Sequence, residues 1–386
     1  MTTFLFCYFK ENYDAFMTYH LQENGFNILE CPELREVIQS TDFFEKASAA
    51  VRSPYMLKEH CKSKLMLVEP VYHILRSESG HKIGTYSYVP ITEVLKHYCS
   101  HEDIVDEIQA NRYMDRDPNY LSDFSDGTYF KEHPFFKVNP HALRLHFYED
   151  EFEVVIPLGS KRTKHKLCAF YYTIGNLDSK HRSKLKHIHL ALLVRQTFVN
   201  RCGLQTILKP MLDELKILEI DGITIKVDGI EQTIHAALAT FSADNLSAHM
   251  LGGFTMSFSS NRICRFCMAT YSEMKEHFNE EDFVLRSPEA HEYHLKCVEN
   301  PEHKATYGVN GPSPLNELKY FDVTKGFPPD IMHDLLEGVV PLTVKLVVCQ
   351  AHKEKHITIQ EMNEELQQLH IGQNDKKTDQ CCFQRD

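Results

Sequence analysis

The feature that most constrains the fold is a run of strand-like segments that begins near residue 142. "LRLHFYEDEFEVV", "KHKLCAFYYTIGN" and "HIHLALLVRQ" are rich in β-branched and aromatic residues. The amphipathic stretch "CGLQTILKPMLDELKILEID", closed by a glycine, follows them as a predicted helix. "GITIKVDGIEQTIHAALATFSAD" then holds two more predicted strands. Consecutive strands, a helix and further strands predict an α/β domain with a sheet of mixed direction.

Other patterns surround this domain. The first part of the chain reads as helical, and "PITEVLKHYCS" and "HEDIVDEIQANRYM" form its last helical pair. A stretch rich in Asp, Pro and Asn comes next and predicts a linker. The predicted division is 1–113, an N-terminal helical region; 114–141, a linker; 142–253, the first part of the α/β core; 254–318, a Cys/His-rich insertion; 319–350, a closing helix; and 351–386, a partly disordered tail.

Composition limits the class of protein. The chain has 386 residues, of which 42% are hydrophobic, so it can bury a sizeable core. It contains no run of 18 apolar residues, which predicts that no segment spans a membrane. Its 12 cysteines are scattered, and "MTTFLFCYFK" at the start does not read as a secretion signal. This usage predicts reduced thiols and therefore the cytosol or the nucleus.

Charge is unevenly distributed along the chain. The net charge of −12 argues against a general nucleic-acid binder. Between residues 161 and 189, however, eight basic residues stand against one acid, Asp178, a local balance of 8 − 1 = +7. Such a cluster is either a solvated surface or a contact for nucleic-acid phosphates. The basic residues are Lys161, Arg162, Lys164, Lys166, Lys180, Arg182, Lys184 and Lys186.

Acidic residues occur within or just after two of the predicted strands. In "FYEDEFEV", alternation places Glu149, Glu151 and Glu153 on one face, and Asp150 on the apolar-looking face with its aromatic neighbours. Asp150 is therefore either an edge-strand acid that faces water or the ligand of a positive species. Asp244 follows "TIHAALATF" and is either a helix N-cap or a ligand, because α/β folds bind ligands at strand ends.

A Cys/His pattern predicts a metal site in the insertion. Cys264 and Cys267 form a CxxC pair, and His291 and His294 follow on a predicted helix that begins after Ser287. The histidines are three apart and share a helix face, and Cys297 could replace one of them. Thiolates and imidazoles in such a set suit tetrahedral zinc. The alternative is free thiols and unrelated surface histidines.

A last polar group lies in "PPDIMHDLLEG", where Asp330 is placed as a helix N-cap. His333 and Glu337 are four apart and project together, while Asp334 points away by about 100°. This pattern is either an ordinary surface His–Glu pair or part of a site.

These pieces together resemble the transposases of CACTA (En/Spm-type) DNA transposons, in the form found in animal genomes. The matching stretches run in order: "YSYVPITEVLKHY", "FYEDEFEVVIPLGSKRTKHKLCAFYYTIGNL", "ADNLSAHMLGGFTMSFSSNRICRFC" and "GPSPLNELKYFDVTKGFPPDIMHDLLEGVVP". They cover most of the chain from about residue 50 to residue 350. The resemblance implies an RNase H-like catalytic domain with an acidic triad, interrupted by a Cys/His insertion.

The resemblance also implies roles for residues. Asp150, Asp244 and Glu337 would be the triad, with Asp334 as the rival third acid. They would hold Mg²⁺ or Mn²⁺ for DNA strand cleavage and transfer, because such ions prefer carboxylate oxygens. Cys264, Cys267, His291 and His294 would hold Zn²⁺. Lys161, Arg162, Lys164 and Lys166 would contact DNA phosphates beside the site.

Three functions remain open from the sequence. The first is a metal-dependent DNA strand transferase or its remnant, in the nucleus, acting on transposon ends or on DNA generally and able to form a homo-oligomer. The second is an inactive nuclear host protein that keeps the fold to bind DNA or protein. The third is a cytosolic zinc-stabilised interaction protein. The tail "IGQNDKKTDQCCFQRD" differs from the family, and the resemblance implies a truncated or host-adopted copy.

Overall fold

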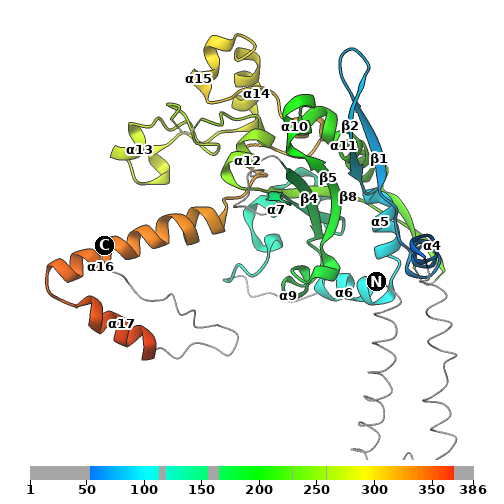
Figure 1. Ribbon diagram of the computed structural model, residues 1–386, viewed down its shortest axis with the longest axis horizontal. Coiled ribbons are helices and arrows are strands. Elements are labelled where there is room, and N and C mark those ends of the chain that lie inside the picture. Colours follow the sequence, from blue (N-terminus) through cyan, green and yellow to red (C-terminus); the bar gives the residue numbers. More distant parts are fainter. Residues whose placement is uncertain (1–52, 113–118, 155–164, 228, 258, 369–386) are drawn as a thin grey trace, which may run out of the picture.

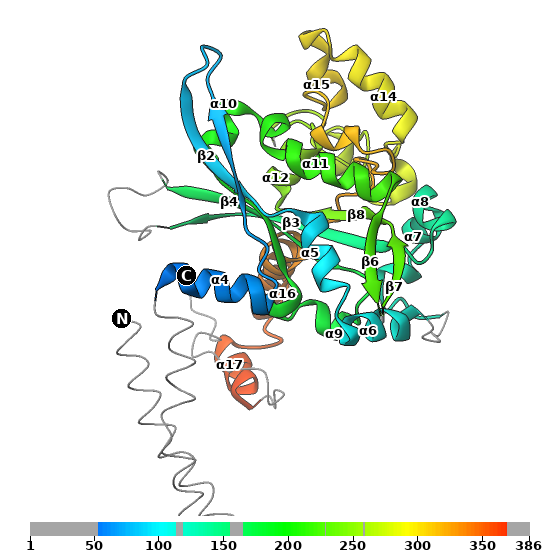
Figure 2. The same ribbon diagram turned by 90° about the vertical axis from the view of Figure 1, so that its right-hand side faces the viewer.

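The structure is a computed structural model that describes residues 53–112, 119–154, 165–227, 229–257 and 259–368. A six-stranded sheet in the order β1-β2-β5-β4-β3-β8 forms its centre (Figures 1 and 2). The strands are β1 (Val71–Arg76), β2 (Lys82–Tyr88), β3 (Leu143–Glu153), β4 (Lys166–Ile174), β5 (His189–Arg195) and β8 (Ala236–Ser242).

The direction of the strands is mixed. β3, β4 and β5 pair in antiparallel fashion, as consecutive strands joined by short connections can. β8 returns after a helix and pairs with β3 in parallel, from Leu143 opposite Ala236 to Tyr148 opposite Ser242. This confirms the predicted α/β class and the mixed sheet.

Helix α11 (Leu204–Ile220) covers one face of the sheet and contacts β5 and β8. Its buried side chains recur with the helical period, so that they form one apolar stripe, and they join Leu145, Phe147 and Leu238 of the sheet in the main core. Gly222, with φ of +70°, follows the helix in the left-handed region, as the sequence predicted. The buried residues of the stripe are Ile207, Leu208, Met211, Leu212, Leu215 and Leu218.

The N-terminal region is not wholly helical, and the prediction for residues 71–80 is wrong. β1 and β2 form a hairpin there, and β2 joins β5 through Ser87 opposite Leu193. The turn is closed by the Gly80 N–H, which donates to Ser77, and Gly80 has φ of +81°. The hairpin is half exposed, so its pattern lacks the clear alternation of a strand with one covered face. The described helices are α4 (Pro54–Leu65), α5 (Ile91–Tyr98) and α6 (Glu102–Arg112), and α5 and α6 confirm the predicted helical pair.

The predicted linker has structure of its own where it is described. Phe135 and Phe136 are buried in a second, smaller core with Ala237 and Ala239 of β8. This core covers part of the sheet face opposite α11. The aromatic residues of this segment make the packing contacts. The segment was predicted as a linker because its composition is rich in turn residues, and composition alone does not indicate such packing. The elements are η2 (Phe124–Asp126), α7 (Thr128–Glu132) and α8 (Pro134–Val138).

The region between α11 and α12 (Asn245–Gly252) holds three strands, whereas two were predicted. β6 (Ile223–Val227) and β7 (Ile230–Ile234) pair only with each other, around Gly229 at φ of +80°. β8 follows and enters the main sheet. The remaining short helices between β4 and α11 are α9 (Ser179–Arg182), η3 (Leu185–His187) and α10 (Gln196–Cys202).

Residues 254–318 form the insertion, whose described part contains short helices and two isolated β-bridges. Its helices lie together on one side of the body (Figure 1). The low strand content agrees with the prediction. The elements are α13 (Glu273–Glu276), η4 (Glu280–Asp282), α14 (Pro288–Cys297), η5 (Pro301–His303), α15 (Lys304–Tyr307) and η6 (Pro314–Glu317).

The last described elements leave the body of the molecule. η7 (Ile331–Val339) is a π-helix that continues into α16 (Val340–Lys353), and α17 (Ile359–Gln368) follows. Figure 1 shows α16 extending away from the sheet. Residues 351–368 were placed in a tail and are helical for most of their length, while residues 369–386 lie outside the described part. No described helix has the length and hydropathy that crossing a lipid bilayer requires.

Candidate functional site

Asp150 lies on β3, which runs between β4 and β8, and it stands opposite Ala169 of β4, two residues beyond the last pairing of β3 with β8. The predicted alternation is confirmed, and Asp150 faces solvent as one of the two alternatives had it, although β3 is not an edge strand. Tyr148 and Phe152, on the face of Asp150, are 42% and 38% exposed, whereas Glu149 is 1% exposed on the face of the main core. This face is therefore open from Tyr148 to Phe152, because η2, α7 and α8 pack over Ala237 and Ala239 of β8 and over Arg144 and His146 at the start of β3.

Asp244 comes two residues after the end of β8 and is the N-cap of α12. Its Oδ1 accepts the N–H of Ser247 at 2.6 Å, which bears out the N-cap interpretation. The other oxygen of a capping carboxylate stays available to a second partner. The parallel register ends with Tyr148 opposite Ser242, so Asp150 lies two residues farther along β3 and Asp244 two residues beyond the end of β8.

The pKa of Tyr148 indicates which acidic residues lie near this end of the sheet. Burial, and then the negative charges of Asp150, Asp330, Glu149 and Asp244, raise the pKa of its hydroxyl. The acids on the open side come from three segments that are far apart in the sequence: β3, the start of α12 and the start of η7. Their concentration makes this end of the sheet strongly negative, which favours a cation there.

The helix that carries the third predicted acid begins at Asp330, as predicted. Asp330 Oδ1 accepts the N–H groups of Met332 and His333, and its Oδ2 lies 2.6 Å from Nδ1 of His333. Burial would raise the pKa of Asp330, but the hydrogen bonds from His333 outweigh it and lower that pKa. The same contact raises the pKa of His333. His333 is therefore paired with Asp330, and the expected His333–Glu337 pair does not form a direct contact.

Glu337 is exposed on η7, and its charge reaches His333. The rival acid Asp334 is closer to the segment of Asp244, because its Oδ1 accepts the side-chain N–H of Asn245. Asp334 Oδ2 accepts the N–H of Asp330 at 3.1 Å. Of the two candidates for the third acid, Asp334 is thus the one that the structure joins to the predicted site. The π-helical turn changes the facing of these side chains relative to an α-helix, and such turns are frequent at functional sites.

Arg265 ties these segments together and was missed by the sequence analysis. It is 4% exposed, and its guanidinium donates to Asn245 Oδ1 at 2.7 Å and to the Pro328 carbonyl at 3.0 Å. Burial lowers its pKa, and the charges of Asp334 and nearby acids oppose that effect. It stands within the CxxC pair, so a basic residue between two cysteines was the one available signal.

The cysteine pair lies in a tight turn. Sγ of Cys264 accepts the N–H groups of Phe266 at 3.3 Å and of Cys267 at 3.4 Å. Burial, with the charge of Cys264 adding to it, raises the pKa of the Cys267 thiol to about 11. Backbone N–H groups directed at a sulfur stabilise its thiolate, the form that binds metal.

The two histidines lie on α14, which begins as predicted: Ser287 is the N-cap and Pro288 the first residue. His291 is 4% exposed, and neither of its ring nitrogens has a hydrogen-bond partner. Nδ1 of His294 also has none. Burial, and then the charge of Arg286, lower the pKa of His291 to about 4 and that of His294 below its usual value, so both rings are neutral. Neutral imidazoles with unpartnered buried nitrogens fit a metal ligand set.

Arg286 connects the CxxC turn to the end of α15. Its Nε donates to the Cys264 carbonyl at 3.2 Å, and its Nη2 donates to the Tyr307 carbonyl at 2.9 Å. The donor types therefore fit zinc. His291 also lines a cavity of about 930 Å³ between α7 and α14, which none of the predicted triad residues lines.

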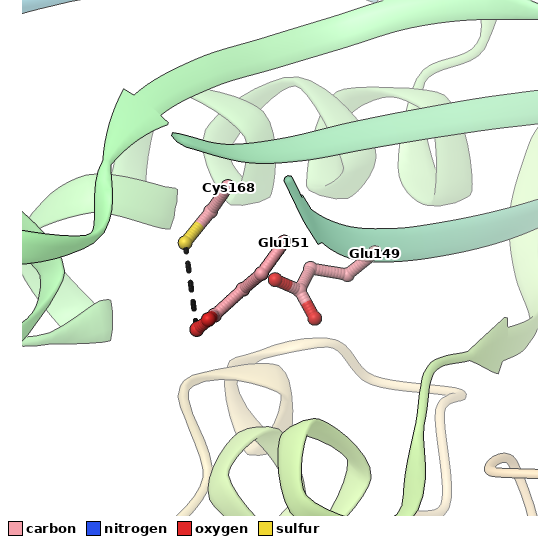
Figure 3. A group of neighbouring side chains, drawn as sticks. All are labelled: Glu149, Glu151 and Cys168. Atoms are coloured by element: carbon pink, nitrogen blue, oxygen red, sulfur yellow. Dashed lines mark hydrogen bonds between the residues drawn. The ribbon is translucent and has the colours of Figure 1, made fainter. Parts of the chain in front are cut away.

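The ligand atoms of these two predicted sites are not gathered closely. Within the part of the chain that the structure describes, one group of three potential ligands has its ligand atoms all within 4.8 Å of one another. That group is Glu149, Glu151 and Cys168 (Figure 3). It includes neither the triad residues nor the Cys/His set, and no pattern in the sequence alone pointed to it.

The basic segment is only partly described. Lys161, Arg162 and Lys164 lie outside the described residues, so their predicted role is unchanged. Lys166 is described, and its Nζ lies 3.2 Å from Glu151 Oε2. Arg182 pairs with Asp123 at 2.7 Å and Lys180 with Asp178 at 3.0 Å. These ion pairs reduce the positive charge that this part of the segment can offer to phosphates.

Comparison of the sequence with protein-family models and with curated proteins finds no match.

Proposed function

We propose that the protein derives from a DNA transposase and has an RNase H-like domain that binds DNA and acts on its phosphodiester bonds with the help of a divalent cation. The strand order supports this: an antiparallel meander of three strands is followed by a helix and a strand parallel to the first of them. The resemblance of the motif stretches to CACTA transposases supports the same function. The nucleus is the compartment that such a function needs.

One observation carries the proposal: Asp150 and Asp244 reach the same end of the sheet. Asp150 lies near the end of β3, and Asp244 lies two residues beyond the end of β8, the parallel neighbour of β3, on a side that is open to solvent at Asp150. Their charges act on one tyrosine hydroxyl. The two carboxylates come from segments 94 residues apart, and a packed strand and the cap of a helix that directly follows a strand hold them, which supports a site of precise geometry.

The donor set fits Mg²⁺ or Mn²⁺, because it offers only hard carboxylate oxygens. Asp150 and Asp244 would hold the cation, with Asp334 or Glu337 as the third acid. Such a cation, when bound, neutralises charge on a phosphate and activates a water or a hydroxyl group. The protein's own residues hold the carboxylates in place: the N-cap bond to Ser247 fixes Asp244, and Asn245 ties Asp334 beside it.

The Cys/His residues would serve a structural role in this proposal. Cys264, Cys267, His291 and His294 would hold Zn²⁺ and so fix α14 against the CxxC turn. Arg265, between the cysteines, would transmit that order to Asn245 and Pro328. The partner of the protein would be DNA, contacted by Lys161, Arg162, Lys164 and Lys166, and a homo-oligomer is compatible with this function.

A second candidate is a protein that keeps the fold and binds DNA or protein without cleaving it. The exposure of Glu337 favours it, because an active triad needs a third carboxylate beside Asp150 and Asp244.

The test is cleavage of a DNA duplex by the full chain in the presence of Mg²⁺ or Mn²⁺. We expect Asp150→Asn and Asp244→Asn each to abolish cleavage while DNA binding persists. Asp213→Asn, at an exposed acid of α11 paired with Lys209, is the matched control and should cleave like the wild type. Comparing Asp334→Asn with Glu337→Gln identifies the third acid. Cleavage that survives both strand variants contradicts the proposal, and DNA binding without cleavage in the wild type supports the second candidate.

A further inference from the structure

A second group of potential ligands lies on the sheet face opposite Asp150. Glu151 stands directly opposite Cys168 in the antiparallel pair of β3 and β4, and Glu149 is two residues away on the same face. Their ligand atoms all lie within 4.8 Å of one another. Figure 3 shows the two carboxylates and the thiol around one small space, with α12 below them.

The burial of Glu149 indicates that a positive ligand would be stabilising in this space. The side chain is 1% exposed, and although the Ser247 side chain lies close enough to favour its charged form, neither carboxylate oxygen has a hydrogen bond of good geometry. Cys168 is equally buried. Lys166, on the neighbouring strand β4, pairs with Glu151 instead, at 3.2 Å. A buried carboxylate with so little compensation and no counter-ion is costly to ionise, and a bound cation would satisfy it.

We propose that Glu149, Glu151 and Cys168 form a binding site for a divalent ion of the zinc class. One sulfur and two carboxylates suit an ion of intermediate softness with four ligands, whereas Mg²⁺ and Ca²⁺ take about six or more oxygen ligands. The Gln196 side-chain oxygen, which accepts the Cys168 thiol hydrogen, is positioned as a fourth ligand. On binding, Cys168 releases its proton to solvent and coordinates as a thiolate.

The site would brace the strand that carries Asp150. Because successive residues of a strand point to opposite faces, an ion held by Glu149 and Glu151 sits behind the backbone of Asp150. Its bond to Cys168 would join β3 to β4 at that level. The proposal does not depend on the proposed function, because it concerns only the covered face of the sheet.

The test uses full-length protein stripped of metal with a chelator and then loaded with ¹¹³Cd²⁺. The cadmium resonance position depends on the number of thiolate ligands, so a site with one sulfur is distinguished from a site at Cys264 and Cys267. We expect a one-thiolate resonance in the wild type and in Cys99→Ala, a control that alters another buried cysteine. It should be absent in Cys168→Ala, and a large excess of Mg²⁺ should leave it unchanged.

Glu149→Gln keeps the shape of the side chain and repeats the test should Cys168→Ala fail to fold. We expect it to weaken Cd²⁺ and Zn²⁺ binding at this site by roughly tenfold or more in a calorimetric titration. The proposal is overturned if the wild type gives no one-thiolate resonance. It is equally overturned if that resonance persists in both variants, or if Mg²⁺ displaces the ion, which would indicate an acidic patch without preference for a softer metal.

Discussion

Strand β3, which carries Asp150, and strand β8, which leads to Asp244, are held differently from the helix that carries Glu337. β3 and β8 contribute side chains to the main core, and their residues Phe147 and Phe241 are 1% and 0% exposed. η7 and α16 project from the body and expose most of their large apolar side chains. Exposed residues of α16 include Val340, Leu342, Val344, Leu346 and Val347.

This difference indicates which side chains of the candidate site have a fixed position. A carboxylate on a packed strand keeps its position because moving it would disturb the core. A carboxylate on an exposed helix is placed only by the contacts at the start of that helix. Here those contacts are the Asp330 cap, the Asn245–Asp334 bond and Arg265. The geometry of the two aspartates is therefore set by the fold, and that of the third acid by a few polar bonds.

The largest expected contrast is in packing. Phe147→Ala removes a ring that lies between Tyr172 and Phe241, and it should lower the free energy of unfolding by about 3–5 kcal/mol. Leu346→Ala, at a residue that is 60% exposed, should change it by about 0.5 kcal/mol or less. Urea unfolding of both variants measures the contrast. Equal losses would mean that α16 is packed in solution.

A second prediction concerns the buried carboxyl group of Glu219, in the packed part of the molecule. Burial raises the pKa of Glu219 on α11 to about 7, although its Oε2 accepts the Lys319 N–H at 3.1 Å. Because the folded value lies above the unfolded one, the folded state binds the proton more tightly, and stability falls as the pH rises from about 4.5 to about 7. The shift corresponds to about 3 kcal/mol at most. Glu219→Gln should remove this pH dependence in chemical unfolding, and an unchanged profile would contradict the assignment.

The junction between the two regions gives a smaller effect. Asn245→Ala removes the bonds that its side chain makes to Asp334 and Arg265 and should cost about 1–2 kcal/mol. Hydrogen exchange in η7 should rise more than exchange in β3, since the bond holds the helix and not the strand. Leu246→Ala, at an exposed neighbour, is the control. A uniform rise across the sheet would show that Asn245 supports the core instead.

The smallest effect is a pH dependence at the start of η7. Asp330 raises the pKa of His333, and His333 in turn lowers that of Asp330. The pair therefore stabilises the folded state from about pH 4 to about pH 6.5, and the contribution of His333 is lost as the pH rises through its raised folded value. His333→Gln should lower the Tm at about pH 5.5 and leave it unchanged well above that folded value. A Tm difference that stays constant with pH would exclude the ion pair as its cause.

Local patterns in the sequence were sufficient for strands β3, β4 and β5, for helix α11 and for the caps at Ser287 and Asp330. Alternation also separated Asp150 from Glu149 and Glu151 correctly. It could not say which face is covered, because that depends on where α11 and the segment of α7 and α8 pack.

The features that were missed depend on the register between distant segments. The proximity of Glu151 to Cys168 follows from the pairing of β3 with β4, which the sequence does not specify residue by residue. The contacts of Arg265 join residues up to 63 positions apart. The hairpin β1–β2 was taken for helix because neither strand has a fully covered face.

The central claim is that Asp150 and Asp244 hold one divalent ion between them. Mn²⁺ titration of the wild type, Asp150→Asn, Asp244→Asn and the double variant, followed by the electron paramagnetic resonance of free Mn²⁺, tests it most directly. If both residues bind one ion, we expect each single variant to lose Mn²⁺ binding at this site and the double variant to lose no more than either. Losses that add independently, or binding that is unchanged in both single variants, would contradict it.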